Sequence, residues 1–431
     1  MKRLPALLTA ERKLLGNIFW LFSLQGLNYV IPLAVLPFLV RRLGIERYGM
    51  IAFAQSLAQY FVIFTDYGFN LSATKQIARV RSDKDSVSNV FCCVVVIKIL
   101  LMAVSAAVLA ALLIAVPRFR ADWILYLVAF VAVIGTVMFP LWLFQGMEEM
   151  KYVSLISGSC KAGAAILLFV FVREGSQYLL ALAILSSGML ATGVVGCVFA
   201  VYRFRIAVRI PDRADLAGTL KDGWHLFVST AATTFYTNSN VFLVGMLAGS
   251  AQAGYFSAAE KIVRGLQGLL VPITQAIYPH VNSLAGRSRE LALRFVRRSF
   301  VWIGLFALVP SVLLFMLAAP VAHLVVGANA AESVSLFRWM APLPFIIAVS
   351  NVLGIQTMIP FGLERRLSRI YVVAGAGSLA LSIVLIHING ALGAAVSVLT
   401  IEAVIVICMW ESLRQQGLHV IAGPIGAPTT G

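Results

Sequence analysis

The chain alternates between long apolar runs and short polar segments from one end to the other. Twelve runs are long enough to cross a bilayer as helices, because about 20 residues at 1.5 Å per residue span the hydrocarbon core. They cover residues 14–40, 48–66, 90–116, 123–145, 152–172, 178–201, 224–248, 254–279, 299–326, 334–359, 368–388 and 390–411. The last two are separated only by the turn Ile388-Asn389-Gly390, which predicts a tight helical hairpin. The pattern predicts an all-α membrane protein with twelve transmembrane helices.

Composition excludes a water-soluble protein. Hydrophobic residues make up 60% of the chain and charged residues 12%, with a mean hydropathy of +0.92, whereas an ordinary soluble domain is roughly a quarter charged. The net charge is +16, but most basic residues lie in short segments between apolar runs and not on a solvated face, so we expect no nucleic-acid partner. The five cysteines all lie in apolar runs without metal-like spacing, and we expect no cofactor.

The basic residues also predict the orientation. An even number of spans places both termini on one side of the membrane. The segments on that side hold 23 Lys and Arg residues, and the segments on the other side hold 7. The positive-inside rule therefore predicts cytoplasmic termini, with Gln177 in the periplasm and Ser288 in the cytoplasm.

The chain divides into two related halves. A basic segment, 206–223, separates an N-terminal lobe of six spans, 1–205, from a C-terminal lobe of six spans, 224–431. Gly44 and Gly49 recur as Gly249 and Gly254, at an offset of 205 residues. The motif Q-G-M-E at 145–148 corresponds to F-G-L-E at 361–364. Internal repeats of this kind are typical of transporters that handle substrate between the repeats.

Four spans at equivalent positions of the two halves carry polar side chains on one helical face. These are the first, second, seventh and eighth spans. Their members include Gln25 and Asn28; Gln55, Gln59 and Asp66; Thr230, Thr233, Thr237 and Asn240; and Glu260, Arg264 and Gln267. We expect these four helices to surround a central polar cleft between the lobes.

Four basic residues lie inside the apolar spans, where each costs about 2.5–3.5 kcal/mol at the bilayer centre. Lys98 is close to the cytoplasmic end of its span, which predicts that its side chain reaches the interface. Lys161 lies near mid-span among small residues and is expected to face the cleft. Glu260 and Arg264 have the i, i+4 spacing of an ion pair, and Lys261 beside them leaves a net positive charge. A purely structural role for the pair stays open.

Two further carboxylates have open interpretations. Asp66 precedes Gly68 at the end of the second span, where a turn residue and a functional residue are equally expected. Glu402 has no basic residue within four positions, so it either pairs across helices or stays protonated. We take Asp66, Glu260 and Glu402 as candidates for gating or ion coupling. No phosphate-binding loop and no catalytic arrangement is present, so we expect no enzyme.

Several motifs together resemble a known family. L-G-x-x-x-Y-G at 43–49 follows a helix with Pro32 and Pro37, and T-D-Y-G-F-N-L-S-A-T follows at 65–74. This order resembles the opening of the O-antigen and exopolysaccharide flippases. Those are the Wzx-like branch of the multidrug/oligosaccharidyl-lipid/polysaccharide exporter superfamily. The segments 140–152, 240–279 and 350–364 are similar to the corresponding family segments.

The resemblance implies a function. The family moves undecaprenyl-diphosphate-linked oligosaccharide repeat units across the bacterial inner membrane by alternating access between two six-helix lobes. On that reading, Lys161, Lys261 and Arg264 are candidates for the diphosphate. The candidates for the sugars and the cleft are Gln25, Asn28, Gln55, Gln59, Thr237, Asn238, Asn240 and Gln267. The implied partners are this polyisoprenyl lipid, membrane lipids, and the polysaccharide polymerase and chain-length regulator.

Two other functions stay open. A drug or cation antiporter of the same superfamily would favour acidic residues in its cleft, whereas the charges here are predominantly basic. A membrane-embedded polysaccharide polymerase would need a sizeable loop for its catalytic groups, and the predicted periplasmic segments are all short.

Overall fold

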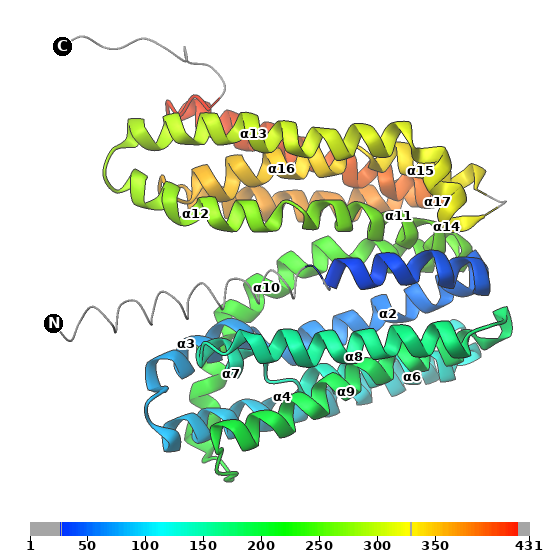
Figure 1. Cartoon of the computed structure of the whole chain (residues 1–431), viewed down its shortest axis with the longest axis vertical. Coiled ribbons are helices and arrows are strands. Elements are labelled where there is room, and N and C mark those ends of the chain that lie inside the picture. The colour runs from blue at the N-terminus through cyan, green and yellow to red at the C-terminus, as the bar shows by residue number, and fades with distance from the viewer. Residues whose placement is uncertain (1–25, 27, 328–329, 421–431) are drawn as a thin grey trace. The chain divides into compact units, whose positions relative to one another are not determined.

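The computed structural model describes residue 26, residues 28–327 and residues 330–420. Throughout these ranges the regular structure is helical, and they contain no strand. The chain forms two compact units, Met1–Phe242 and Leu243–Gly431 (Figure 1). They join inside α10 (Arg213–Ala248), whose first turns include part of the basic segment 206–223. The lobe boundaries inferred from that segment stay a prediction.

The N-terminal unit is a set of long helices joined by short connections. Residues 28–43 are helical and form the first helix of its described part. The following elements, before α10, are α2 (Ile45–Asp66), α3 (Phe69–Val80), α4 (Lys84–Ala115), α5 (Pro117–Ala121), α6 (Trp123–Met138), α7 (Leu141–Gly146), α8 (Met150–Phe171), the 3-10 turn η1 (Gly175–Gln177) and α9 (Tyr178–Phe204).

The C-terminal unit has the same character. Its elements after α10 are α11 (Ser250–Gly268), α12 (Val271–Ala285), α13 (Arg289–Met316), α14 (Ala318–Val326), α15 (Ala331–Met340), α16 (Leu343–Leu353), the π-helical segment η2 (Gly354–Met358) and α17 (Glu364–Gln415). The predicted hairpin at its end is confirmed: α17 is two helices joined through non-helical Asn389 and Gly390. Ser382 and Ser397 hydrogen-bond across this hairpin at 2.9 Å.

Two glycines give the proposed repeat a structural counterpart. Gly44 precedes α2 with a φ of 83°, and Gly249 precedes α11 with a φ of 94°. Residues that have a Cβ rarely adopt a positive φ of this size, so both positions favour glycine. The same backbone turn therefore begins a helix at two positions that are 205 residues apart in the sequence.

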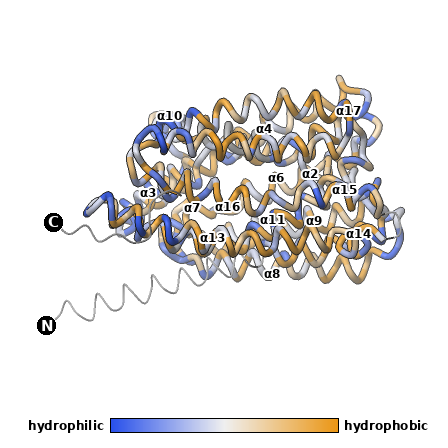
Figure 2. Tube along the Cα trace, turned by 90° about the horizontal axis from the view of Figure 1, so that it is seen from above, coloured by the Kyte–Doolittle hydropathy of each residue, from blue (hydrophilic) through white to orange (hydrophobic). Residues whose placement is uncertain are grey.

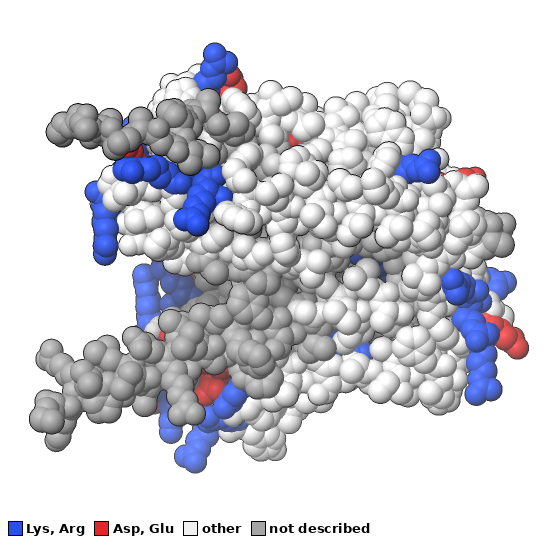
Figure 3. All heavy atoms as spheres, turned by 45° about the horizontal axis from the view of Figure 1, so that its top comes forward, with Lys and Arg blue, Asp and Glu red and all other residues white. Residues whose placement is uncertain are grey.

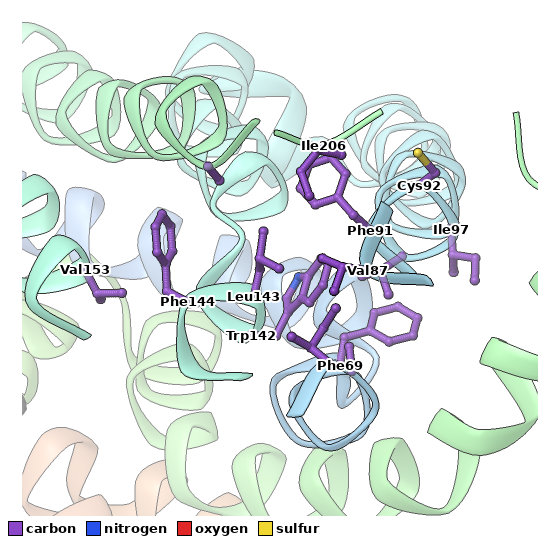
Figure 4. Close-up of a cluster of buried hydrophobic side chains, with 14 of the residues drawn as sticks. Phe69, Val87, Phe91, Cys92, Ile97, Trp142, Leu143, Phe144, Val153 and Ile206 are labelled. Carbon is purple, nitrogen blue, oxygen red and sulfur yellow. The ribbon is translucent and has the colours of Figure 1, made fainter. Parts of the chain in front are cut away.

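A cluster of apolar side chains forms the core at one end of the N-terminal unit (Figure 4). It is centred on Trp142, Leu143 and Phe144, which have exposures of 1% or less. Pro140 interrupts the preceding helix and starts the short α7 that carries them. Trp142 packs against Phe91 of α4, with ring centroids 5.9 Å apart. This core fixes the ends of α3, α4, α7 and α9 around one another.

Close backbone contact holds α6 against α9. A Cβ built on Gly193 of α9 would lie 2.1 Å from the carbonyl oxygen of Gly135 in α6. Only glycine permits this approach. Small residues at helix crossings are a common means of packing helices in membranes, where the hydrophobic effect between helices is absent.

Seven helical segments in the described part of the chain are long and apolar enough to cross a membrane. Figure 2 shows apolar residues along much of the length of the helices and polar residues mostly near their ends. On the face drawn in Figure 3, Lys and Arg gather at the two ends of the helices and a largely uncharged band lies between them. The seven do not include α2, α10 and α11, which carry predicted polar residues. A multi-pass membrane protein is confirmed, whereas the count of twelve helices stays a prediction.

Candidate functional site

The predicted polar face of α2 changes from buried to exposed along the helix. Tyr48 and Ala52 at its start are 1% and 4% exposed, so they belong to the core of the N-terminal unit. Gln55 is half-buried and Gln59 is exposed. The amides available to a ligand are therefore those of Gln55 and Gln59, from the middle of α2 onward.

Lys161 and Asn28 meet across two helices. The Lys161 ammonium, in the middle of α8, donates a hydrogen bond to Asn28 Oδ1 on the first helix. Both side chains are half-buried. An amide oxygen accepts this hydrogen bond but carries no full negative charge to offset that of the ammonium. Gln25, three residues before Asn28 in the sequence, lies outside the described residues.

Asp66 is an ion-pair partner and not merely a turn residue. It ends α2, and its carboxylate lies 3.4 Å from the Lys98 ammonium of α4. The same carboxylate accepts a hydrogen bond of 2.8 Å from Asn70. Lys98 is 2% exposed, so the prediction that it reaches the membrane interface is wrong. Its helix, α4, packs beside α2, and this packing buries the Lys98 ammonium next to Asp66.

The predicted polar residues of α10 differ in accessibility. Asn238 is half-buried, Asn240 is 7% exposed, and both take part in interactions within the structure. Between them, Ser239 hydrogen-bonds with Tyr60 of α2. This part of α10 is thus tied to α2 by polar contacts. Thr237 lies outside the described side chains.

The C-terminal unit holds the charged group predicted on α11. Arg264 donates a hydrogen bond of 2.9 Å to Glu260, which confirms the i, i+4 ion pair. The Arg264 side chain is 42% exposed and that of Glu260 is 18% exposed, so the guanidinium remains the more accessible partner. Lys261 and Gln267 on the same helix are half-buried.

Glu402 lies apart from the α11 group on α17. It interacts within the structure and acts electrostatically on Tyr371, whose hydroxyl hydrogen-bonds with Ser350. These contacts link the two halves of the α17 hairpin to α16. The two interpretations of Glu402, a pair across helices and a protonated carboxyl, both stay predictions.

The structure thus joins some predicted residues and adds others. It brings Lys161 to Asn28 and Glu260 to Arg264. It adds Lys98 as the partner of Asp66. The sequence did contain a signal for that pair, because Asp66 and Lys98 are oppositely charged residues within or at the end of apolar spans. Nothing in their spacing of 32 residues indicated that α2 and α4 pack there.

Comparison with known proteins shows relatives along nearly the whole chain. A family profile described as "Polysaccharide biosynthesis protein" matches residues 14–285. A protein of Escherichia coli (strain K12) named "Putative O-antigen transporter" is 33% identical over 412 residues, covering 96% of this chain and 99% of that protein. A protein of Shigella dysenteriae with the same name is 30% identical, covering 92% and 99%.

Solved structures share the fold at low sequence identity. A multidrug resistance MATE family transporter of the MOP superfamily, in an inward-facing conformation, matches with a TM-score of 0.65 at 15% identity, covering 90% of this chain and 98% of its own. A MATE crystal structure in the straight conformation matches with a TM-score of 0.61 at 14% identity, covering 94% and 96%. The fold is therefore that of a MATE-like transporter. The chain belongs to the polysaccharide biosynthesis protein family, and its resemblance to the Wzx-like flippases is confirmed.

Proposed function

We propose that this protein moves undecaprenyl-diphosphate-linked oligosaccharide repeat units from the cytoplasmic to the periplasmic leaflet of the bacterial inner membrane. The transport uses alternating access between two six-helix lobes, and both termini lie in the cytoplasm. The observation that carries the proposal is the 33% identity, over 96% of the chain, to a protein named as an O-antigen transporter. The polysaccharide polymerase and the chain-length regulator are its expected protein partners.

The chemistry of the polar residues supports this substrate. Gln55, Gln59 and Asn28 offer amide groups, which donate and accept hydrogen bonds as sugar hydroxyls require. Lys161 donates a hydrogen bond to a neutral amide oxygen and not to a carboxylate. Arg264 presents a guanidinium that is 42% exposed, and such a group binds a phosphate oxygen pair with two parallel hydrogen bonds.

A multidrug antiporter is the second candidate, because the MATE transporters share this fold. A cationic drug would need carboxylates that are free to bind it. Here Asp66 is paired with Lys98 and Glu260 with Arg264. The polar positions therefore suit an anionic lipid better than a cation.

A deletion strain tests the proposal. Lipid-linked repeat units should accumulate on the cytoplasmic leaflet, because their synthesis there continues. Extracted lipids would be compared after whole cells have been treated with a glycan-modifying reagent confined to the periplasm. We expect accumulated units that escape modification, and normal modification once the gene is restored.

The same strain separates the two candidates. Normal modification without accumulation would contradict the flippase proposal. Increased sensitivity to cationic drugs, together with normal polysaccharide, would favour the antiporter. Polymer production must be measured alongside sensitivity, because loss of surface polysaccharide can itself increase drug entry.

A further inference from the structure

The C-terminal unit contains an apolar groove that the proposed transport does not use. It lies between α12 and α13 and has a volume of about 680 Å³. At about 30 Å³ per water-sized group, this volume holds on the order of twenty such groups. Its walls include Ile273 and Ile277 from α12 and Trp302, Phe306 and Val309 from α13.

The α13 wall of the groove is one continuous helical face. Phe295, Arg298, Trp302, Leu305 and Val309 are separated by three or four residues, so they lie above one another. Trp302, Leu305 and Val309 are 66%, 53% and 58% exposed. A row of large exposed apolar side chains in a membrane helix is a surface for hydrocarbon.

The row contains one basic residue, Arg298. Within the described part of the chain, Arg298 makes no ion pair and no hydrogen bond. Its neighbours are engaged: Arg294 pairs with Glu290, and Arg297 donates to the carbonyl of His419. Arg298 is therefore the guanidinium of this cluster that is open to an anion from outside the chain.

The length of the groove along α13 indicates which anion, since the residues of α13 that line it end at Val309. Arg298 and Val309 are eleven residues apart, which corresponds to about 16 Å along a helix. This is about half of the roughly 30 Å hydrocarbon core, or the depth of one leaflet. A glycerophospholipid has chains of one leaflet's depth, whereas an undecaprenyl chain is much longer. One guanidinium also matches the single negative charge of a phosphodiester.

We propose that this groove is a binding site for one anionic glycerophospholipid, such as phosphatidylglycerol. Arg298 binds its phosphodiester, and the row from Trp302 to Val309 packs against its acyl chains. Basic pockets between transmembrane helices recognise anionic lipid headgroups in this way. The site is independent of the transported substrate, since the binding argument uses no residue assigned to transport.

Quenching of tryptophan fluorescence can test the site directly. The protein would be placed in phosphatidylcholine nanodiscs that contain a small fraction of a lipid brominated on its acyl chains. The contribution of Trp302 is the difference between the unsubstituted protein and Trp302→Phe. The contribution of Trp339 is the difference between the unsubstituted protein and Trp339→Phe. It serves as the control for ordinary lipid contact, because Trp339 lies on α15 and is 46% exposed. We expect brominated phosphatidylglycerol to quench Trp302 more strongly than brominated phosphatidylcholine, and both lipids to quench Trp339 equally.

Matched arginine variants test the headgroup contact. Arg298→Gln should reduce the preference for phosphatidylglycerol at Trp302 about fivefold, the factor that corresponds to about 1 kcal/mol for one basic residue at an anionic surface. Arg294→Gln, on the same helix but engaged with Glu290, should keep the preference. Unchanged quenching by brominated phosphatidylcholine would show that each variant is folded.

Three outcomes would overturn the proposal. Equal quenching of Trp302 by the two lipids would mean that the groove holds ordinary surrounding lipid. An unchanged preference in Arg298→Gln would remove the role of the guanidinium. Displacement of the brominated lipid by an equimolar amount of polyprenyl phosphate would assign the groove to a polyprenyl chain instead.

Discussion

Lys98 of α4 and Asp66 of α2 form an ion pair at 3.4 Å in which the lysine is 2% exposed and the aspartate 19%. Each charge lies on a different helix, so the pair links the end of α2 to the middle of α4. Asn70 binds the same carboxylate at 2.8 Å. Removing one member of a buried pair leaves the other charge uncompensated, which costs about 3–5 kcal/mol.

Lys98→Gln should therefore destabilise the protein by about 3 kcal/mol, at the lower end of that range because Asn70 still binds Asp66. Thermal unfolding of the purified protein would measure the loss. Lys84→Gln, at the exposed start of the same helix, should have little effect. Equal melting temperatures for Lys98→Gln and Lys84→Gln would contradict the importance of the pair.

A double variant separates stability from function at this pair. Lys98→Met with Asp66→Leu should recover most of the stability, because a buried ion pair can often be replaced by apolar residues of similar size. Recovered stability with recovered polymer production would assign the pair a structural role only. Recovered stability without production would support the proposed role of Asp66 in gating or ion coupling.

Local features of this fold were predictable from the sequence, and contacts between helices were not. The Glu260–Arg264 pair and the turn at Asn389 and Gly390 depend on residues within a few positions of each other. The burial of Lys98 depends instead on which helix packs beside α4. Hydropathy marks the apolar run of α4 but does not identify its neighbour.

The contact between Lys161 and Asn28 shows the same limit. The two residues are 133 positions apart, and each was expected to face the cleft for a separate reason. Periodicity indicates the polar face of a helix but not the neighbour that the face meets. The sequence repeat was a better guide to local structure. Gly44 and Gly249 share a backbone conformation with positive φ, which glycine adopts more readily than other residues.

Gly193 should be indispensable for packing α9 against α6. Gly193→Ala places a Cβ about 2 Å from a backbone oxygen of Gly135, and overpacking of this kind costs about 1–3 kcal/mol. Gly163→Ala on α8 is the matched control, because no atom lies within 4 Å of the added Cβ. Its helix should keep or gain stability. Melting temperatures in detergent would compare the two, and an equal response would contradict the packing argument.

The orientation can be tested at two connections between helices. Gln177 ends η1, and Ser288 precedes α13. The imbalance of 23 to 7 basic residues predicts Gln177 in the periplasm and Ser288 in the cytoplasm. Reporter enzymes that are active on one side only, fused at each position, should report opposite sides. Reversed activities, at matched expression, would invert the topology and with it the assignment of cytoplasmic termini.

Asn28→Asp should impair transport by capturing Lys161. The new carboxylate would form an ion pair where the amide now accepts a hydrogen bond, and the lysine would be less available to the substrate diphosphate. A hydrogen bond to a charged group is worth about 1.5–3 kcal/mol, so we expect at least about a tenfold loss of lipid affinity without loss of stability. Binding to purified protein would measure it.

Lys161 and Lys151, both on α8, provide a test of this prediction and its control. Lys161→Gln should reduce polymer production strongly. Lys151→Gln should not, because Lys151 lies at the start of the helix and is 44% exposed. Wild-type binding in both Asn28→Asp and Lys161→Gln would remove Lys161 from the diphosphate site.

The pair of Glu260 and Arg264 predicts an exchange of partners during transport. In the absence of substrate the carboxylate holds Arg264 at 2.9 Å, which partly neutralises the guanidinium. A diphosphate offers the same guanidinium a stronger, bidentate partner. Glu260 then competes with the substrate and favours its release. Glu260→Gln should therefore bind the lipid diphosphate more tightly and transport it more slowly.

Substitutions at Arg264 complete this test. Arg264→Gln should lose both binding and transport, and Arg264→Lys should be intermediate, because lysine keeps the charge but not the planar fork. Binding would be measured in nanodiscs and transport in liposomes with the same protein preparations, after equal melting temperatures have been established. If Glu260→Gln weakened binding as much as Arg264→Gln does, the pair would be structural. Removing a carboxylate that competes with the substrate should strengthen binding, not weaken it.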